Sequence, residues 1–279
     1  MATGGRDDDQ RGPRPGHPDR RDRPGDRWRR IGMIAPSSNT VLEPETMRMA
    51  AGLGDAVSIH VARVGVTQIS TSARSSDQFG FDGMLDAAGR LADTLPDAIV
   101  WNGTAASWLG LDRDAELARR MAARTGVACA TTMLFFEAAF AALGIRRLAL
   151  VTPYTSEIQE RVVANLGGLG LEIVAERRLE DAGNFSYAEY SAAFVAGEIR
   201  QAIRAARPDA VAVMCTNYRG ARAAAEIEPE TGVRVLDSVA LTLWGALALA
   251  GVPTAPLAAH GRLFTELPAE AARAAAARP

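Results

Sequence analysis

The 279 residues are 48% hydrophobic and 23% charged, which is enough apolar material to bury a large core as one domain or as two compact lobes. The formal net charge of −2 gives no electrostatic reason to expect nucleic acid or an anionic membrane as a partner, so a small molecule is the expected ligand. The basic residues are all arginines, which excludes Schiff-base chemistry on lysine and, with it, pyridoxal phosphate as a cofactor.

The first 28 residues are polar and rich in Arg, Asp, Pro and Gly, and they lack the apolar core of a signal peptide. We expect them to be a disordered tail. No later apolar run reaches the roughly 18 residues of a membrane span. Two cysteines, Cys129 and Cys215, are too few for a disulfide framework, and no Cys/His cluster has the spacing of a metal site. The sequence therefore predicts a cytoplasmic protein without a bound metal.

From Arg30 onward, short apolar runs alternate with longer segments of helical period. This alternation predicts an α/β fold in which short parallel strands are buried between helices. The expected strands are residues 30–35, 57–62, 98–101, 127–130, 147–151, 172–175, 210–214 and 233–236.

Two of the helical segments have apolar residues at three-and-four spacing, so each is predicted to pack one side against a sheet. The first runs from Phe81 to Leu95, and the second runs from Tyr187 to Ile203. We interpret the aromatic residues of the second segment as core.

The chain contains an internal repeat. Residues 30–36, RIGMIAP, match residues 147–153, RLALVTP, and the strand start PDAIV at 96–100 matches PDAVA at 208–212. The seventh residue after the proline is Gly103 in the first copy and Cys215 in the second. The repeat predicts two pseudo-symmetric lobes that face each other across a cleft, because loops at the carboxyl ends of parallel strands form the ligand crevice.

Cys215 is the candidate reactive residue, because a polar run beginning with Thr216 follows it directly at a strand end. The alternative is an inert, buried cysteine that acts as a small hydrophobic residue. Cys129 lies in an apolar strand and has no match in the repeat, so we interpret it as structural. The three histidines have no partner at metal or triad spacing and are not candidates.

The loop that follows the first strand, residues 36–40, offers polar donors that can cap the next helix, bind a carboxylate, or do both. Ser38 and Asn39 are its candidate binding residues. The equivalent loop of the second half adds the phenol of Tyr154 and the hydroxyl of Thr155. Together these side chains are suited to holding a carboxylate from two sides.

Four motifs give the sequence a family resemblance: PSSN at 36–39, the run 144–154 that ends in VTPY, the strand end at Cys215, and LDS at 236–238. Over residues 30 to 255 the chain resembles the maleate cis-trans isomerase and arylmalonate decarboxylase branch of the aspartate/glutamate racemase superfamily. The resemblance implies two lobes, an active site between them, and no cofactor. It also implies that the chain returns to the first lobe near its end. We therefore expect a first lobe of 29–132 completed by about 235–265, a second lobe of 133–234, and a helix or tail at 266–279.

Racemases and maleate isomerases of this superfamily place one cysteine from each lobe against the substrate, but here Gly103 stands in place of the first. In this respect the chain resembles the decarboxylases, whose corresponding stretch is similar to GTAASW at 103–108. By that resemblance, residues from both lobes hold the retained carboxylate while it becomes an enediolate, and Ala105 adds no hydroxyl of its own. These residues are Thr104, Ala105, Tyr154 and the backbone at Thr216.

Asn39 and Asn184 match carboxylate-contacting positions of the isomerases, although Asn184 also fits a turn. The resemblance thus implies a cofactor-independent lyase that protonates an enediolate from Cys215. One alternative is maleate cis-trans isomerisation or a related racemase-like isomerisation. Another is a non-catalytic protein that binds carboxylates. A small carboxylate is the expected partner, and a homodimer is one option for the assembly.

Overall fold

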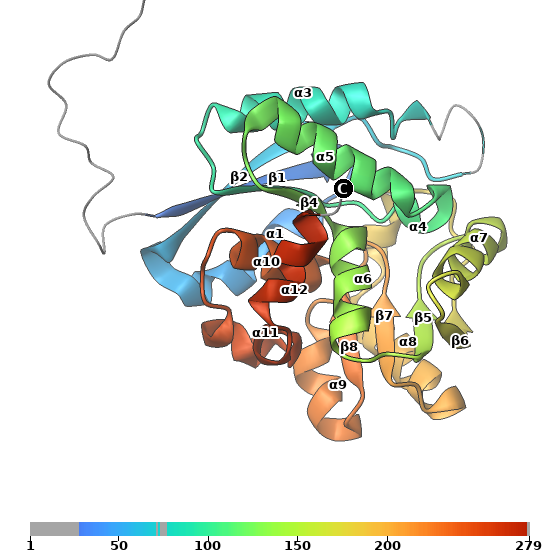
Figure 1. Ribbon diagram of the computed structural model, residues 1–279. Coiled ribbons are helices and arrows are strands. Elements are labelled where there is room, and N and C mark those ends of the chain that lie inside the picture. The colour runs from blue at the N-terminus through green and yellow to red at the C-terminus, as the bar shows by residue number, and fades with distance from the viewer. Residues whose placement is uncertain (1–27, 71, 73–76, 278–279) are drawn as a thin grey trace, which may run out of the picture.

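The computed structural model describes residues 28–70, 72 and 77–277, and in them it shows two four-stranded parallel sheets flanked by helices (Figure 1). The predicted α/β fold with two lobes is confirmed. All the predicted strands are present, and their bounds shift by only a few residues. The first sheet has the order β2-β1-β3-β4 and the second has the order β6-β5-β7-β8. The strands are β1 Arg29–Pro36, β2 Val57–Val64, β3 Ala98–Trp101, β4 Cys129–Thr131, β5 Arg147–Val151, β6 Glu172–Arg177, β7 Ala210–Val213 and β8 Arg234–Asp237.

Helices follow most of the strands, as expected for parallel connections. In Figure 1, α3 and α5 cover one side of the first sheet, and α1, α10 and α12 lie on the other side. The helices are α1 Leu42–Ala50, η2 Ala51–Ala56, α3 Phe81–Ala92, α4 Ala106–Leu109, α5 Asp112–Thr125, α6 Thr132–Ala142, α7 Ser156–Gly167, η3 Ser186–Glu189, α8 Ala192–Ala206, α9 Ala223–Thr231, α10 Ser238–Leu249, η4 Ala255–His260, α11 Leu263–Glu266 and α12 Ala269–Ala276.

The Pro-Asp pair of the repeat performs the same structural task in both halves. The Asp97 carboxylate accepts a hydrogen bond from the backbone N–H of Arg30 at 2.9 Å, and the Asp209 carboxylate accepts one from the N–H of Arg147 at 2.8 Å. The backbone N–H of each aspartate donates to the carbonyl of the same arginine. Each aspartate thus ties the amino end of one central strand, β1 or β5, to its neighbour in the sheet.

The end of the chain packs on the first sheet. Helix α10 is buried along most of its length and contacts α1, α6 and β3, and α12 packs on α6 and α10. The predicted lobe boundaries fall at the start of α6 and inside β8. Helix α6 packs with first-lobe elements, whereas β8 is the edge strand of the second sheet. The predicted disordered tail, apart from Trp28, lies outside the described residues.

One helix prediction was wrong in its extent. The segment from Tyr187 to Ile203 is broken, because Tyr187 lies in η3 and the Ser191 hydroxyl caps a new helix, α8, by accepting from the N–H of Phe194 at 3.1 Å. Phe194 is 42% exposed and is not core. In the other segment, Leu95 lies beyond the end of α3 and is exposed.

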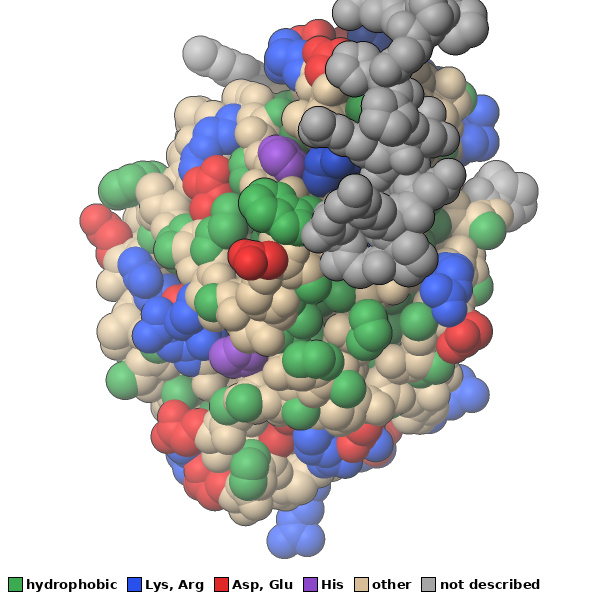
Figure 2. All heavy atoms as spheres, turned by 90° about the vertical axis from the view of Figure 1, so that its left-hand side faces the viewer, with side chains coloured by type: hydrophobic (Ala, Val, Ile, Leu, Met, Phe, Trp, Pro, Cys, Tyr) green, Lys and Arg blue, Asp and Glu red, His purple; other side chains and the backbone are tan. Residues whose placement is uncertain are grey.

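The distribution of charged side chains on the surface agrees with the near-zero net charge of the sequence. On the face shown in Figure 2, acidic and basic side chains are interspersed with neutral ones and form no continuous basic stripe. None of the helices within the described ranges is long and apolar enough to cross a membrane.

The repeated aspartates lead to a stability prediction. Asp209→Ala removes the acceptor of two backbone N–H groups, those of Arg146 and Arg147, and should lower the free energy of unfolding by about 1 kcal/mol. Asp97→Ala should cost a similar amount, and Asp93→Ala, at the exposed end of α3, should cost nothing comparable. Chemical denaturation measures all three. Equal free energies of unfolding for the Asp209 and Asp93 variants would contradict a stabilising role for the hydrogen bonds that Asp209 accepts.

The same bonds predict a pH dependence. The backbone N–H groups of Arg147 and Arg146 lower the pKa of Asp209 below its ordinary value. Its contribution is therefore fully present above that ordinary value and is lost as the pH falls through the lowered one. The stability difference between wild type and Asp209→Ala should shrink in acid.

Candidate active site

A cavity lies where the carboxyl ends of the two sheets meet. In this conformation its volume is about 20 Å³, which is room for about one water molecule. Its lining comes from the ends of β1, β2, β3, β5, β6 and β7 and the loops that follow them, as the parallel topology predicts for a ligand site. The residues are Pro36, Val66, Ile69, Phe79, Trp101, Gly103, Thr104, Ala105, Trp108, Tyr154, Asn184, Tyr187, Cys215 and Thr216.

Cys215 reaches this cavity two residues after the end of β7, and only 4% of it is exposed. Burial raises the pKa of its thiol to about 12, and hydrogen bonds from the backbone N–H of Asn217 and the hydroxyl of Tyr154 oppose that rise only in part. The sulfur therefore carries its proton at neutral pH. A protonated thiol is suited to donating a proton and is a poor nucleophile.

Tyr154 and Thr104 bring two hydroxyls together from opposite lobes. Their oxygens are 2.8 Å apart, and both residues are buried. Burial raises the pKa of Tyr154 well above its ordinary value, so the phenol remains a hydrogen-bond donor. Thiol, phenol and threonine hydroxyl thus converge on one small space.

The predicted residue Asn39 does not line the cavity but links the lobes. Its side-chain N–H donates to the Thr216 hydroxyl at 3.0 Å, and its side-chain oxygen accepts from the backbone N–H groups of Val41 and Leu42 at the start of α1. The side-chain oxygen of Asn217 accepts from the N–H groups of Thr40 and Val41, also at the start of α1. Asparagines from both lobes therefore satisfy the first turn of the same helix.

Of the other predicted residues, some line the cavity and some do not. Asn184 lines the cavity, and its side-chain N–H donates to the hydroxyl of Ser38 at 2.7 Å, so Ser38 supports it from behind. Gly103 and Ala105 also line the cavity. Thr155 precedes α7 without a capping bond and does not reach the cavity.

Sequence reasoning missed the aromatic wall of the cavity. Trp108 packs edge-on against Tyr154, with ring centroids 5.1 Å apart, and against Phe79, at 5.9 Å. Tyr187, interpreted from the sequence as core, contacts Tyr154 at 6.0 Å and lines the cavity. The available signal was Trp108 at the end of the predicted 103–108 stretch and Trp101 two residues before it.

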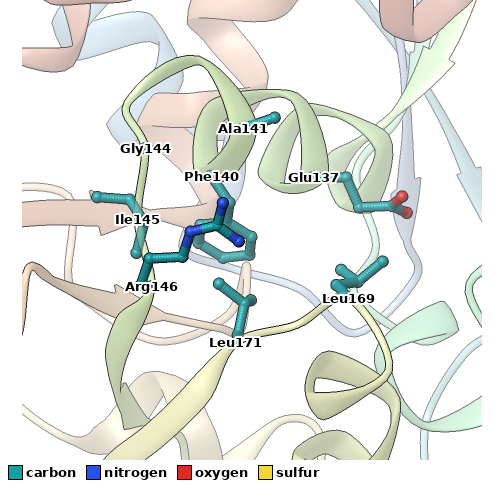
Figure 3. A pocket seen from close by; sticks show the side chains of 8 residues that line it. All are labelled: Glu137, Phe140, Ala141, Gly144, Ile145, Arg146, Leu169 and Leu171. Atoms are coloured by element: carbon teal, nitrogen blue, oxygen red, sulfur yellow. The ribbon is translucent and has the colours of Figure 1, made fainter.

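A larger cavity, of about 330 Å³, opens at the amino end of β5. Figure 3 shows the side chains of Phe140, Arg146 and Leu171 converging on it, with Glu137 at its edge. It has no thiol and lies at the end of the sheet opposite to Cys215, so we do not assign the chemistry to it. Across the residues that the structure describes, no cluster of His, Cys, Asp and Glu fits a metal ion.

Comparison with known proteins identifies the family. A family model described as arylmalonate decarboxylase matches residues 31–264. The chain belongs to this family. One relative, the arylmalonate decarboxylase of Bordetella bronchiseptica, is 28% identical to this chain over 238 residues. These residues are 85% of this chain and 96% of the relative. The maleate isomerase of Pseudomonas putida is 27% identical over 229 residues, 78% of this chain and 90% of the relative.

Solved structures agree. A crystal structure of arylmalonate decarboxylase superposes with a TM-score of 0.66 at 27% identity, covering 80% of this chain and 92% of the other. The structure of Nocardia farcinica maleate cis-trans isomerase bound to TRIS superposes with a TM-score of 0.71 at 25% identity, covering 85% of this chain and 97% of the other. The relatives are decarboxylases and isomerases, so this member of the arylmalonate decarboxylase family is an enzyme.

The state of the thiol leads to a reactivity prediction. Because burial raises the pKa of Cys215 from an ordinary value of 9.0 to about 12, iodoacetamide should alkylate it at pH 8 at least ~100-fold more slowly than in the unfolded chain. Peptide mass spectrometry measures the two rates. Denatured protein is the control, in which Cys129 and Cys215 should react alike. Native alkylation as fast as that of the unfolded chain would mean that the thiol is neither buried nor protonated as described.

Proposed function

We propose that this protein is a cofactor-independent lyase that removes carbon dioxide from a malonate carrying an apolar substituent, and that Cys215 protonates the resulting carbon. The observation that carries the proposal is a buried, protonated thiol in a cavity whose pseudo-equivalent position in the other lobe is a glycine, Gly103. A site with one thiol acid is better suited to protonating the substrate carbon once, from one face, than to exchanging protons on both of its faces.

The steps balance without a co-reactant. The bond between the α-carbon and one carboxylate breaks, and its electron pair passes into the retained carboxylate to form an enediolate. The Cys215 thiol then gives its proton to the α-carbon and becomes a thiolate. Solvent water returns a proton to the sulfur, so the net change is loss of carbon dioxide and uptake of one proton.

In this proposal, groups from both lobes stabilise the enediolate. The hydroxyls of Thr104 and Tyr154 and the backbone at Thr216 offer hydrogen bonds within the cavity lining. Fixed donors in a buried site stabilise developing negative charge strongly, because they need no reorganisation when the charge forms.

The apolar part of the lining favours departure of the other carboxylate. Val66, Ile69 and Phe79 come from the loop after β2, and Trp108 comes from α4. A carboxylate is poorly solvated there, whereas neutral carbon dioxide is not, so the environment destabilises the charged group that is lost.

Maleate isomerisation is the second candidate. It is favoured by Asn184, whose side chain reaches the cavity, and by the relative that is a maleate isomerase. Against it, position 103 carries no nucleophile, and the side-chain N–H of Asn39 is directed to Thr216. Retention of maleate without turnover would instead fit a non-catalytic binder.

A substrate screen separates these functions. We expect the enzyme to release carbon dioxide from phenylmalonate and to convert a disubstituted malonate into one enantiomer, with maleate unchanged. Cys215→Ala should abolish turnover while preserving ligand binding, because the thiol supplies the proton but not the fold. Chiral chromatography and calorimetry measure the two effects. Undiminished turnover by Cys215→Ala would refute the role of the thiol, and fumarate formed from maleate would favour the isomerase.

The enediolate donors give a second test. Tyr154→Phe removes one buried donor and should lower kcat by roughly 100-fold with a smaller change in KM, since the donor acts mainly on the developing charge. Tyr190→Phe is the matched control, because Tyr190 lies outside the cavity lining and should leave kcat unchanged. Equal kcat in both variants would exclude Tyr154 from the reaction.

A further inference from the structure

Gly103 is in contact with the indole of Trp101. A Cβ added at position 103 would lie 2.2 Å from Cζ2 and 2.3 Å from Cε2 of that ring. Carbon atoms that are not bonded to each other approach no closer than about 3.5 Å without strain. Every side chain at position 103, cysteine included, therefore requires the indole to move.

The indole has little freedom to do so. Trp101 is the last residue of β3, where it pairs with Ile34 of β1 and Thr131 of β4. Its carbonyl accepts a hydrogen bond from the Thr132 hydroxyl at 3.2 Å, and only 1% of the residue is exposed. A rigid ring anchored on a central strand cannot bend away as a long flexible side chain would.

Trp101 also forms part of the cavity lining. Its ring lines the first-lobe side, and Cys215 lines the second-lobe side, at the pseudo-equivalent strand end. Indole has no acidic or basic group that exchanges protons with carbon near neutral pH. At position 103, the first-lobe side is thus occupied by an indole ring that neither exchanges protons with carbon nor leaves room for another side chain.

We propose that Trp101 is the specificity-determining residue of this site. It excludes an acid–base side chain at position 103 and thereby restricts proton delivery to the side of Cys215. As part of the lining of a cavity of only about 20 Å³, it also limits the size of the substituent that the substrate carries on that side. This inference deepens the proposed function and, in its stereochemical part, rests on it.

A thermal-stability cycle tests the steric part without any substrate. Gly103→Cys should lower Tm by roughly 2–10 °C, because it overpacks a rigid site. In a Trp101→Ala background the same change should cost less than about 2 °C, since the new side chain occupies freed space. Gly245→Ala is the matched control, because its Cβ would lie 2.4 Å from Phe135 and its loss should be the same in both backgrounds.

Additive Tm losses for positions 101 and 103 would overturn the proposal. If Gly103→Cys gives no folded protein, recovery of folded protein in the double variant supports the proposal, and failure of the double variant where Trp101→Ala folds overturns it. Trp101→Leu, which keeps an apolar side chain, replaces Trp101→Ala if the latter does not fold.

The stereochemical part of the proposal is tested by measuring which enantiomers of the product are formed. Wild type should form one enantiomer from a disubstituted malonate, and the double variant Trp101→Ala with Gly103→Cys should form both, because thiols then stand on both sides. Trp101→Ala alone should keep one enantiomer and should turn over substrates with bulkier substituents. A single enantiomer from an active double variant overturns the proposal. If wild type decarboxylates no malonate, the proposed function fails, and the Tm cycle still decides whether Trp101 excludes a side chain at position 103.

Discussion

The two lobes are held together at the start of α1, and the rest of the site depends on that junction. The side-chain oxygens of Asn39 and Asn217 accept hydrogen bonds from the first N–H groups of the helix, one from each lobe. Asn217 lies two residues after Cys215, and its own backbone N–H donates to the sulfur. The loop that caps a helix of the first lobe therefore also positions the thiol of the second. Movement of one lobe against the other would displace the sulfur from Tyr154 and Thr104.

Burial gives this arrangement its chemical character. The cavity leaves the thiol and the phenol protonated at neutral pH, because desolvation penalises the charged form of each. The same apolar surroundings strengthen hydrogen bonds to a developing enediolate. A narrow, largely buried space thus provides both the proton and the stabilisation of the charge that will receive it. Phe79, Trp101 and Trp108 line this space and help to keep it narrow.

Much of this could be predicted from the sequence, because it is local or repeated. The strands follow from apolar runs, and the alignment of Pro96–Asp97 with Pro208–Asp209 revealed the duplication and placed Cys215 at a strand end. What could not be predicted depends on packing between distant loops. Whether the side chain of Asn39 faces the cavity or Thr216 depends on contacts across 177 residues of chain. Tyr187 is core as predicted, but it was assigned to the same helix as Ile203 because the helical spacing continues through a break that only the cap at Ser191 reveals.

The position of the repeated aspartates has a consequence for how such an enzyme can be modified. Asp97 and Asp209 fasten the sheets at the amino ends of the strands, and the reacting groups stand at the carboxyl ends, a full strand length away. The contacts that stabilise each sheet and the groups that react therefore lie at opposite ends of the strands. The residue at position 103 or 215 can therefore differ, glycine in one half and cysteine in the other, without disturbing the aspartate contacts that the two sheets share.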